Sequence, residues 1–177
     1  MLFKTHLLPH FGERPAASVI DTIVIHAMHS AKAGRELDPL ACFETLQEHQ
    51  VSAHYAVSCD GSIFLLVPEE KRAFHAGESR LPFEGDMREK VNDFSIGVEL
   101  IATAEEGFSE QQYQALSSLT TEILTRHSIR YIVGHEHIAP GRKSDPGPRF
   151  DWKRYEGMVR SNSAQGSSPA ICFGGLK

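Results

Sequence analysis

The stretch Thr22-Ile23-Val24-Ile25-His26 decides the fold. It is rich in β-branched residues, which favour a buried strand. We expect this strand to end at His26, and the ends of strands are where α/β proteins build their active sites. A lone histidine at a strand end is more often structural than a metal ligand. This stretch therefore predicts the sheet, and it only suggests a site.

Signals for helices and strands alternate on the C-terminal side of this strand. Asp38-Pro39 supplies an N-cap followed by proline at the first helical position, and Ser109 with Gln112 forms a capping box. The pair Asp60-Gly61 between two alternating apolar runs predicts a β-hairpin. The expected elements are a helix from Asp38, strands at 53–58, 62–67, 95–101 and 130–133, a helix from Ser109, and a final helix at 151–160.

This alternation predicts an α/β fold, a single domain with a central mixed β-sheet flanked by helices. The 177 residues suffice to bury a core without disulfides. We expect the domain to span residues 1–160 and residues 161–177 to form a mobile C-terminal tail. Residues 72–92 are polar and aperiodic, which predicts a long loop, and loops of that length in compact domains are usually functional.

Composition excludes some classes of function and favours others. A net charge of -5 argues against nucleic acid or an anionic membrane as partner. The chain has no apolar run long enough for a membrane span, and its first residues lack the apolar stretch of a secretory signal. The three cysteines have no CxxC spacing, so we expect reduced thiols in a cytoplasmic monomer, with the cell envelope as the alternative location.

Two histidines and one aspartate suggest a metal centre. A catalytic zinc site needs about three protein ligands and one open position. His26 and His135 both follow strand-like runs, and Asp145 lies ten residues after His135 in a loop rich in proline and glycine. Such a loop can hold a defined shape that brings Asp145 back towards His135 and aims Lys143 at the same place. We expect the zinc site in a groove at the sheet edge.

Four blocks of the sequence resemble those of a known protein family. The run from Val133 to Pro148, VGHEHIAPGRKSDPGP, resembles the signature of the AmpD-type N-acetylmuramoyl-L-alanine amidases, the amidase-2 family. Residues 92–100, NDFSIGVEL, resemble a second block, and 51–55, VSAHY, with 74–77, FHAG, resemble two more. The blocks occur in family order over residues 20–155, so residues 1–160 are expected to be an amidase-2 catalytic domain.

The resemblance implies both a cofactor and a reaction. It makes His26, His135 and Asp145 the ligands of one Zn²⁺, Glu99 the catalytic carboxylate, and Lys143 a cation beside the reacting carbonyl. The implied reaction is hydrolysis of the amide between the lactyl group of N-acetylmuramic acid, in its 1,6-anhydro form, and L-alanine. The implied partners are anhydro-muropeptides, and the implied role is peptidoglycan recycling.

The choice of Glu99 depends on one departure within the family. The peptidoglycan recognition proteins and a phage lysozyme place a catalytic tyrosine just before the histidine of the VSAHY block, whereas this chain has Ala53 there. Glu99 should therefore do this work, as in the AmpD branch. Its apolar neighbours predict a buried carboxylate with a raised pKa, although an exposed carboxylate is the simpler alternative.

The remaining candidates concern the substrate. Arg72 and Lys90 could bind carboxylates of the stem peptide. His75 resembles a residue that lines the groove, and Asn92 could hold loop backbone or bind peptide. His54 lies within a predicted strand, where a packed, hydrogen-bonded core histidine is the favoured interpretation.

Three alternatives remain open. A periplasmic or secreted wall-remodelling amidase would act on intact peptidoglycan with the same chemistry, and it would need an export signal. A phage-type endolysin would commonly carry a wall-binding module. A non-catalytic peptidoglycan-recognition module is expected to lack a zinc ligand, whereas all three positions are filled here.

Overall fold

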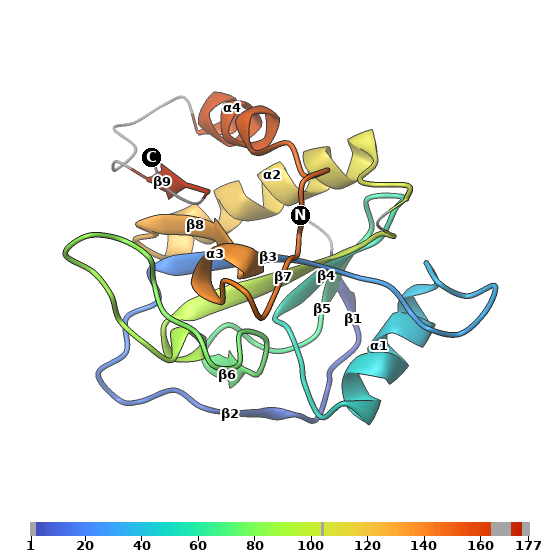
Figure 1. Cartoon of the computed structure of the whole chain (residues 1–177), viewed down its shortest axis with the longest axis horizontal. Coiled ribbons are helices and arrows are strands. Elements are labelled where there is room, and N and C mark those ends of the chain that lie inside the picture. Colours follow the sequence, from blue (N-terminus) through green and yellow to red (C-terminus); the bar gives the residue numbers. More distant parts are fainter. Residues whose placement is uncertain (1–2, 104, 164–170, 175–177) are drawn as a thin grey trace.

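A seven-stranded mixed sheet organises the protein in the computed structural model, which describes residues 3–103, 105–163 and 171–174 (Figure 1). The strand order is β1-β5-β4-β7-β3-β8-β9, and β2 pairs with β6 in a separate two-stranded sheet. Only β4 and β5 pair antiparallel in the large sheet. The strands are β1 (Lys4–Thr5), β2 (Phe11–Glu13), β3 (Thr22–Met28), β4 (Tyr55–Val57), β5 (Ile63–Leu65), β6 (Lys71–Ala73), β7 (Ser95–Ile101), β8 (Tyr131–Gly134) and β9 (Cys172–Phe173). The helices are α1 (Pro39–Glu48), the 3₁₀ helix η1 (Val91–Asp93), α2 (Glu110–Arg126), α3 (His135–Ile138) and α4 (Trp152–Asn162).

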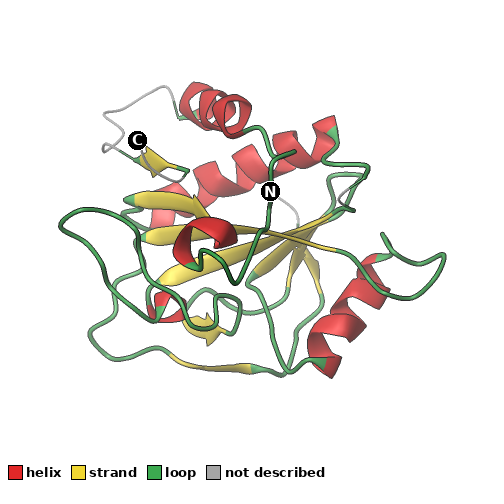
Figure 2. Cartoon of the chain, in the orientation of Figure 1, coloured by secondary structure: helices red, strands yellow, loops and turns green. Residues whose placement is uncertain are grey.

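The two faces of the sheet have different coverings. Helices α2 and α4 pack on one face, and α1 with the small β2–β6 sheet lies on the other (Figure 2). Side chains alternate along a strand, so Ile23 and Ile25 of β3 join the core under α2 and α4. Val24 belongs to a separate cluster on the opposite face. His26, two residues after Val24, therefore projects to the face away from α2.

The helix and hairpin signals in the sequence are confirmed. The Asp38 side chain accepts a hydrogen bond from Leu40 N–H with Pro39 at the first helical position, and Ser109 with Gln112 forms the capping box of α2. Strands β4 and β5 pair antiparallel, and Gly61 takes the left-handed conformation, at φ +80°, that this tight connection requires.

Short strands near the N-terminus and within the expected loop were not predicted. Arg72 lies on β6, opposite Gly12 of β2, so the loop is shorter than residues 72–92 at both ends. These strands are only two or three residues long. A run of that length carries too little periodicity to be read from sequence, and it exists because tertiary packing supplies a partner strand.

Part of the expected C-terminal tail is packed on the domain. Helix α4 continues to Asn162, Ile171 is buried in the main core, and Cys172–Phe173 pair with β8 as the seventh strand. Residues 164–170 and 175–177 of the expected tail lie outside the described part of the chain. The short apolar segment after residue 170 therefore extends the sheet.

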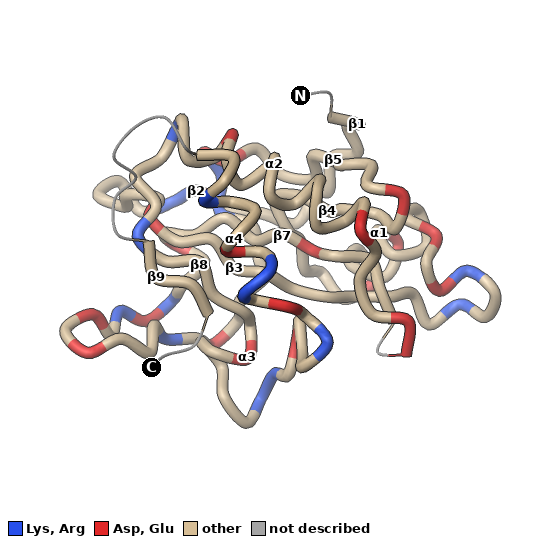
Figure 3. Tube along the Cα trace, turned by 90° about the horizontal axis from the view of Figure 1, so that it is seen from above, with Lys and Arg blue, Asp and Glu red and all other residues tan. Residues whose placement is uncertain are grey.

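The surface mixes charges of both signs. Acidic and basic residues are interspersed over the molecule (Figure 3). Within the described ranges, every helix is too short or too polar to span a lipid bilayer.

Glu69 links the end of α2 to the hairpin. Its carboxylate accepts hydrogen bonds from Tyr55, Arg126 and His127, each at 2.8 Å. Burial alone would raise the pKa of Glu69, but the side-chain hydrogen bonds from Arg126, His127 and Tyr55 outweigh burial and lower the pKa to about 2. The ionised form of Glu69 is therefore stabilised by folding.

Glu69→Gln should destabilise the protein at neutral pH by about 1–3 kcal/mol and flatten its acid sensitivity. A carboxylate with a depressed pKa contributes stability that is fully present above pH about 4.5 and is lost as the pH falls towards 2. Urea unfolding measured between pH 7 and pH 3 tests this. The control is Glu122→Gln, since Glu122 contacts the same Arg126 from an exposed position. If the free energy of unfolding of Glu69→Gln falls with decreasing pH as steeply as that of the unaltered protein, Glu69 is not the source of this acid sensitivity.

Candidate metal centre

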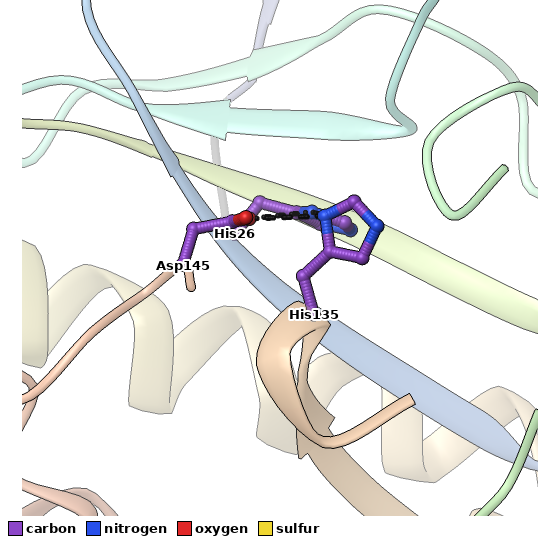
Figure 4. Close-up of side chains that lie close together, drawn as sticks. All are labelled: His26, His135 and Asp145. Carbon is purple, nitrogen blue, oxygen red and sulfur yellow. Dashed lines mark hydrogen bonds and ion pairs between the residues drawn. The ribbon is translucent and has the colours of Figure 1, made fainter. Parts of the chain in front are cut away.

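Three side chains converge at the end of the central strands. His26 lies on β3, His135 is the first residue of α3 directly after β8, and Asp145 lies on the following loop (Figure 4). His26 Nδ1 is 3.0 Å from His135 Nδ1 and 3.1 Å from Asp145 Oδ2, and His135 Nδ1 is 3.2 Å from Asp145 Oδ2. These three atoms form a nearly equilateral triangle.

Strand pairing and one tethered loop produce this triangle. The parallel pairing of β3 with β8 sets Ile25 beside Gly134, so the next residues, His26 and His135, are neighbours. Glu136 N–H donates to the carbonyl of Asp145 at 2.9 Å, which ties the loop back to α3. A Cβ at Gly134 would lie 2.8 Å from Pro146 Cδ, so glycine there lets the loop pack against the strand end.

The protonation states suit a metal ligand set. Burial lowers the pKa of His26 to about 4. Burial by itself would raise the pKa of Asp145, but its contacts with the rings of His135 and His26 outweigh burial and hold the pKa below the ordinary range. At neutral pH His26 is therefore neutral and Asp145 ionised, which are the forms that bind metals.

The remaining imidazole nitrogens also have partners. His135 Nε2 lies 3.1 Å from the carbonyl oxygen of Ala76, and His26 Nε2 lies 3.0 Å from His75 Nδ1. A carbonyl can only accept, so His135 carries a proton on Nε2, and its Nδ1 is the nitrogen that faces the triangle. Donor atoms separated by 3.0–3.2 Å match the edge of about 3.3 Å expected between tetrahedral ligands with zinc bonds of 2.0–2.1 Å. The donor set therefore fits a zinc-sized cation.

Glu99 faces the same site because of strand register. It pairs with His26 across β7 and β3, and register partners in a parallel sheet project to the same face. Glu99 is 8% exposed, and its Oε2 is buried without a hydrogen-bond partner among the described residues. Burial, with a further contribution from the charge of Asp145, raises the pKa of Glu99 to about 8, while Lys143 acts in the opposite direction. The predicted burial and raised pKa of Glu99 are thus present in the structure.

An open cavity adjoins the ligand cluster. Its volume is about 340 Å³, and its walls include His29, Thr103, Phe108, Asp145 and Arg149. Lys143 lies exposed on the same loop as Asp145, and its positive charge lowers the pKa of both His26 and Glu99. The cavity therefore meets the ligand cluster at Asp145.

The residues predicted to contact substrate occupy different places. Asn92 Oδ1 accepts the backbone N–H groups of His75 and Ala76, at 3.2 and 2.8 Å, so it holds loop backbone. His75 is buried and contacts His26. Arg72 pairs with Asp93 at 2.9 Å.

Lys90 lies beside a second cavity of about 450 Å³, which Glu78, Arg80 and Ile138 also line. Among the described residues, no hydrogen bond or ion pair joins Arg72 or Lys90 to the metal-ligand triangle. His54 is fully buried, and its Nδ1 accepts from Gly97 N–H, which confirms the packed core histidine.

Sequence reasoning missed the contacts behind the ligands. The Ala76 carbonyl holds His135, and Arg142 donates to the same oxygen at 2.7 Å. A backbone atom leaves no signature in residue type, so no sequence signal could have identified Ala76.

Asp145→Ala should weaken zinc binding by more than about 100-fold, because even the loss of an outer partner of a ligand costs 10–100-fold. Competition with a chromogenic chelator measures the affinity directly. The matched control is Ser144→Ala, a change at an exposed neighbour on the same loop, which should leave the affinity unchanged. Equal affinities for Asp145→Ala and the unaltered chain would rule out Asp145 as a ligand.

Comparison with known proteins agrees with this geometry. Residues 16–148 match the family model Amidase_2, described as N-acetylmuramoyl-L-alanine amidase. The chain is 37% identical over 170 residues to the 1,6-anhydro-N-acetylmuramyl-L-alanine amidase AmpD of Citrobacter freundii. The alignment covers 88% of this chain and 89% of that protein.

Two solved structures have the same fold. A selenomethionine derivative of AmpD superposes with a TM-score of 0.73 at 35% identity, covering 89% of this chain and 94% of that one. AmpDh3 from Pseudomonas aeruginosa, in complex with anhydromuramic pentapeptide, superposes with a TM-score of 0.63 at 31% identity. This superposition covers 78% of this chain and 59% of that one. The family match begins before β3 and ends just after Asp145, so it takes in the whole ligand cluster. The chain therefore belongs to the Amidase_2 family and is an AmpD-type N-acetylmuramoyl-L-alanine amidase.

Proposed function

We propose that the chain is a zinc amidase that cleaves soluble 1,6-anhydro-muropeptides between the lactyl group of the muramic acid and L-alanine. The observation that carries this proposal is the convergence of His26, His135 and Asp145 with the buried Glu99, whose Oε2 has no hydrogen-bond partner among the described residues, on one face of the sheet. The proposed role is recycling of wall fragments in the cytoplasm.

The donor set supports zinc as the metal. Two imidazole nitrogens and one carboxylate oxygen form a common ligand set of catalytic zinc, and three protein ligands leave one position open. Zinc would supply a Lewis acid that polarises the substrate carbonyl and lowers the pKa of a water molecule to about 7.

Glu99 is the proposed proton carrier. Its pKa of about 8 lies near the working pH, which is where a general acid–base group is most effective. The buried Oε2 has no competing partner among the described residues, so it can take a proton from the attacking water and return it to the leaving nitrogen of L-alanine. The register with His26 keeps this carboxyl group next to the metal ligands.

Lys143 is the proposed electrostatic partner of the reacting carbonyl. Its positive charge lowers the pKa of both Glu99 and His26, which supports a role for the ammonium group at this site. A cation there would stabilise the oxyanion that develops as the amide is attacked. The loop that carries Asp145 also carries Lys143, so one loop conformation positions a metal ligand and a catalytic cation.

The relatives support the anhydro form of the substrate. The Citrobacter freundii protein is named a 1,6-anhydro-N-acetylmuramyl-L-alanine amidase, and the AmpDh3 structure holds an anhydromuramic pentapeptide. Lys90, beside its own cavity, is the better candidate for a stem-peptide carboxylate, because Arg72 is already paired with Asp93. The free thiols of Cys42, Cys59 and Cys172 are in keeping with the reducing conditions of the cytoplasm.

The first experiment measures free peptide released from purified 1,6-anhydro-muropeptide and from intact sacculi. Each substrate is tested with and without a chelator, and again after zinc is restored. Cleavage of the soluble fragment alone, abolished by chelation and recovered with zinc, is the expected result. Cleavage of sacculi would instead assign the protein to wall remodelling, and binding without cleavage of either substrate would leave a recognition module.

Lys143→Ala should lower turnover by about 10²–10³-fold, or about 2.7–4 kcal/mol, while leaving zinc content unchanged.

Glu99→Gln should lower turnover by about 10²–10⁴-fold, also with zinc retained, because the amide keeps the shape but cannot carry the proton. Turnover and zinc content are measured on the same preparations. Parallel loss of zinc and turnover in Lys143→Ala would show that the lysine supports the metal site instead of the reaction.

A further inference from the structure

His75 is a buried histidine that the proposed chemistry does not use. It lies just after β6, is 8% exposed, and its ring packs edge-on against His26, with the ring centroids 5.1 Å apart. The ring fits against β7 because residue 97 is glycine. A Cβ at that position would lie only 2.4 Å from His75 Cγ. A ring enclosed in this way is placed to act on His26, and it is poorly placed to reach a ligand in solvent.

The direction of the hydrogen bonds around His75 can be derived. Ser95 Oγ lies 2.6 Å from the carbonyl of Val91, which can only accept, so the Ser95 hydroxyl donates there. Its oxygen is then an acceptor for His75 Nε2, at 3.1 Å. The proton of His75 therefore resides on Nε2.

The hydrogen-bond directions extend to the metal ligand. The His75 ring is enclosed and, among the described residues, has no carboxylate beside it, so it holds one proton, and with that proton on Nε2 its Nδ1 holds a lone pair. His26 Nε2, 3.0 Å away, must then be the donor. With its proton on Nε2, His26 presents the Nδ1 lone pair to His135 and Asp145.

Adjacent residues serve the two ligand histidines. The side chain of His75 receives the Nε2 proton of His26, and the carbonyl of Ala76 receives the Nε2 proton of His135. Asn92 Oδ1 accepts the backbone N–H of both residues and so fixes their position. Metal-ligating histidines generally need such a partner on the second nitrogen to hold their tautomer and orientation.

We propose that His75 is a positioning residue that fixes the tautomer and orientation of the metal ligand His26, through the chain Val91–Ser95–His75–His26. This inference rests on the proposed zinc centre and replaces the expectation that His75 contacts substrate. It concerns metal binding, so it can be tested without any muropeptide. Failure of the amidase assay and failure of this inference are therefore separate results.

The test compares His75→Leu with His75→Asn in the full chain. The two replacements have nearly the same shape, but asparagine keeps an acceptor oxygen near the position of Nδ1. Zinc affinity, measured by chelator competition, should fall about 10–100-fold in His75→Leu and stay within about threefold of the unaltered protein in His75→Asn. Equal affinities for His75→Leu and the unaltered protein would overturn the proposal, as would an equal loss in both variants.

A second measurement observes the tautomers directly. NMR of the isotope-labelled imidazole nitrogens in the metal-free protein should show His26 and His75 both protonated on Nε2. The His26 signal should move away from this pattern in His75→Leu and keep it in His75→Asn. A proton on Nδ1 of His26 in the unaltered protein would overturn the inference even if neither variant folds.

Discussion

Three electron-rich atoms facing one another at 3.0–3.2 Å form an arrangement that only a cation makes favourable, and the rest of the site depends on it. Two imidazole nitrogens and a carboxylate oxygen repel one another through their lone pairs wherever no proton or metal ion lies between them. The surrounding structure must therefore hold them in place before a metal binds. This requirement gives a physical reason for the rigid elements behind each ligand, which a site for a neutral ligand would not need.

Several distant segments meet that requirement. Strands β3 and β8 deliver the two histidines, and the loop tethered to α3 delivers Asp145. Behind them, Asn92 holds the backbone that supports both histidines. Arg14, from the N-terminal segment, donates to the carbonyls of Asn92, Asp93 and Ser95 at 2.8–3.1 Å, and so fixes η1 and the start of β7. The ligand geometry is thus coupled to the packing of the N-terminal segment.

The same scaffold separates the roles of the two carboxylates. Contacts with the histidine rings lower the pKa of Asp145, whereas the buried Oε2 of Glu99 has no hydrogen-bond partner in the described part of the chain and burial raises the pKa of this group. One group therefore suits metal binding and the other suits proton transfer, although both are acidic side chains on one face of the sheet. Environment assigns these roles, since the intrinsic acidities of aspartate and glutamate differ little.

The sequence by itself determined the main strands, the capped helices, the hairpin and the three residues of the candidate metal site. Capping, turn chemistry and strand periodicity act over a few residues, and the ligand motif is carried by residue types in a fixed order. Tertiary structure alone decided the short strands β1, β2, β6 and β9, which need a partner to exist. It also decided the place of His75, whose ring lies behind His26 because Gly97, Ser95 and Asn92 surround it. Those contacts join segments far apart in the chain, so no local pattern encodes them.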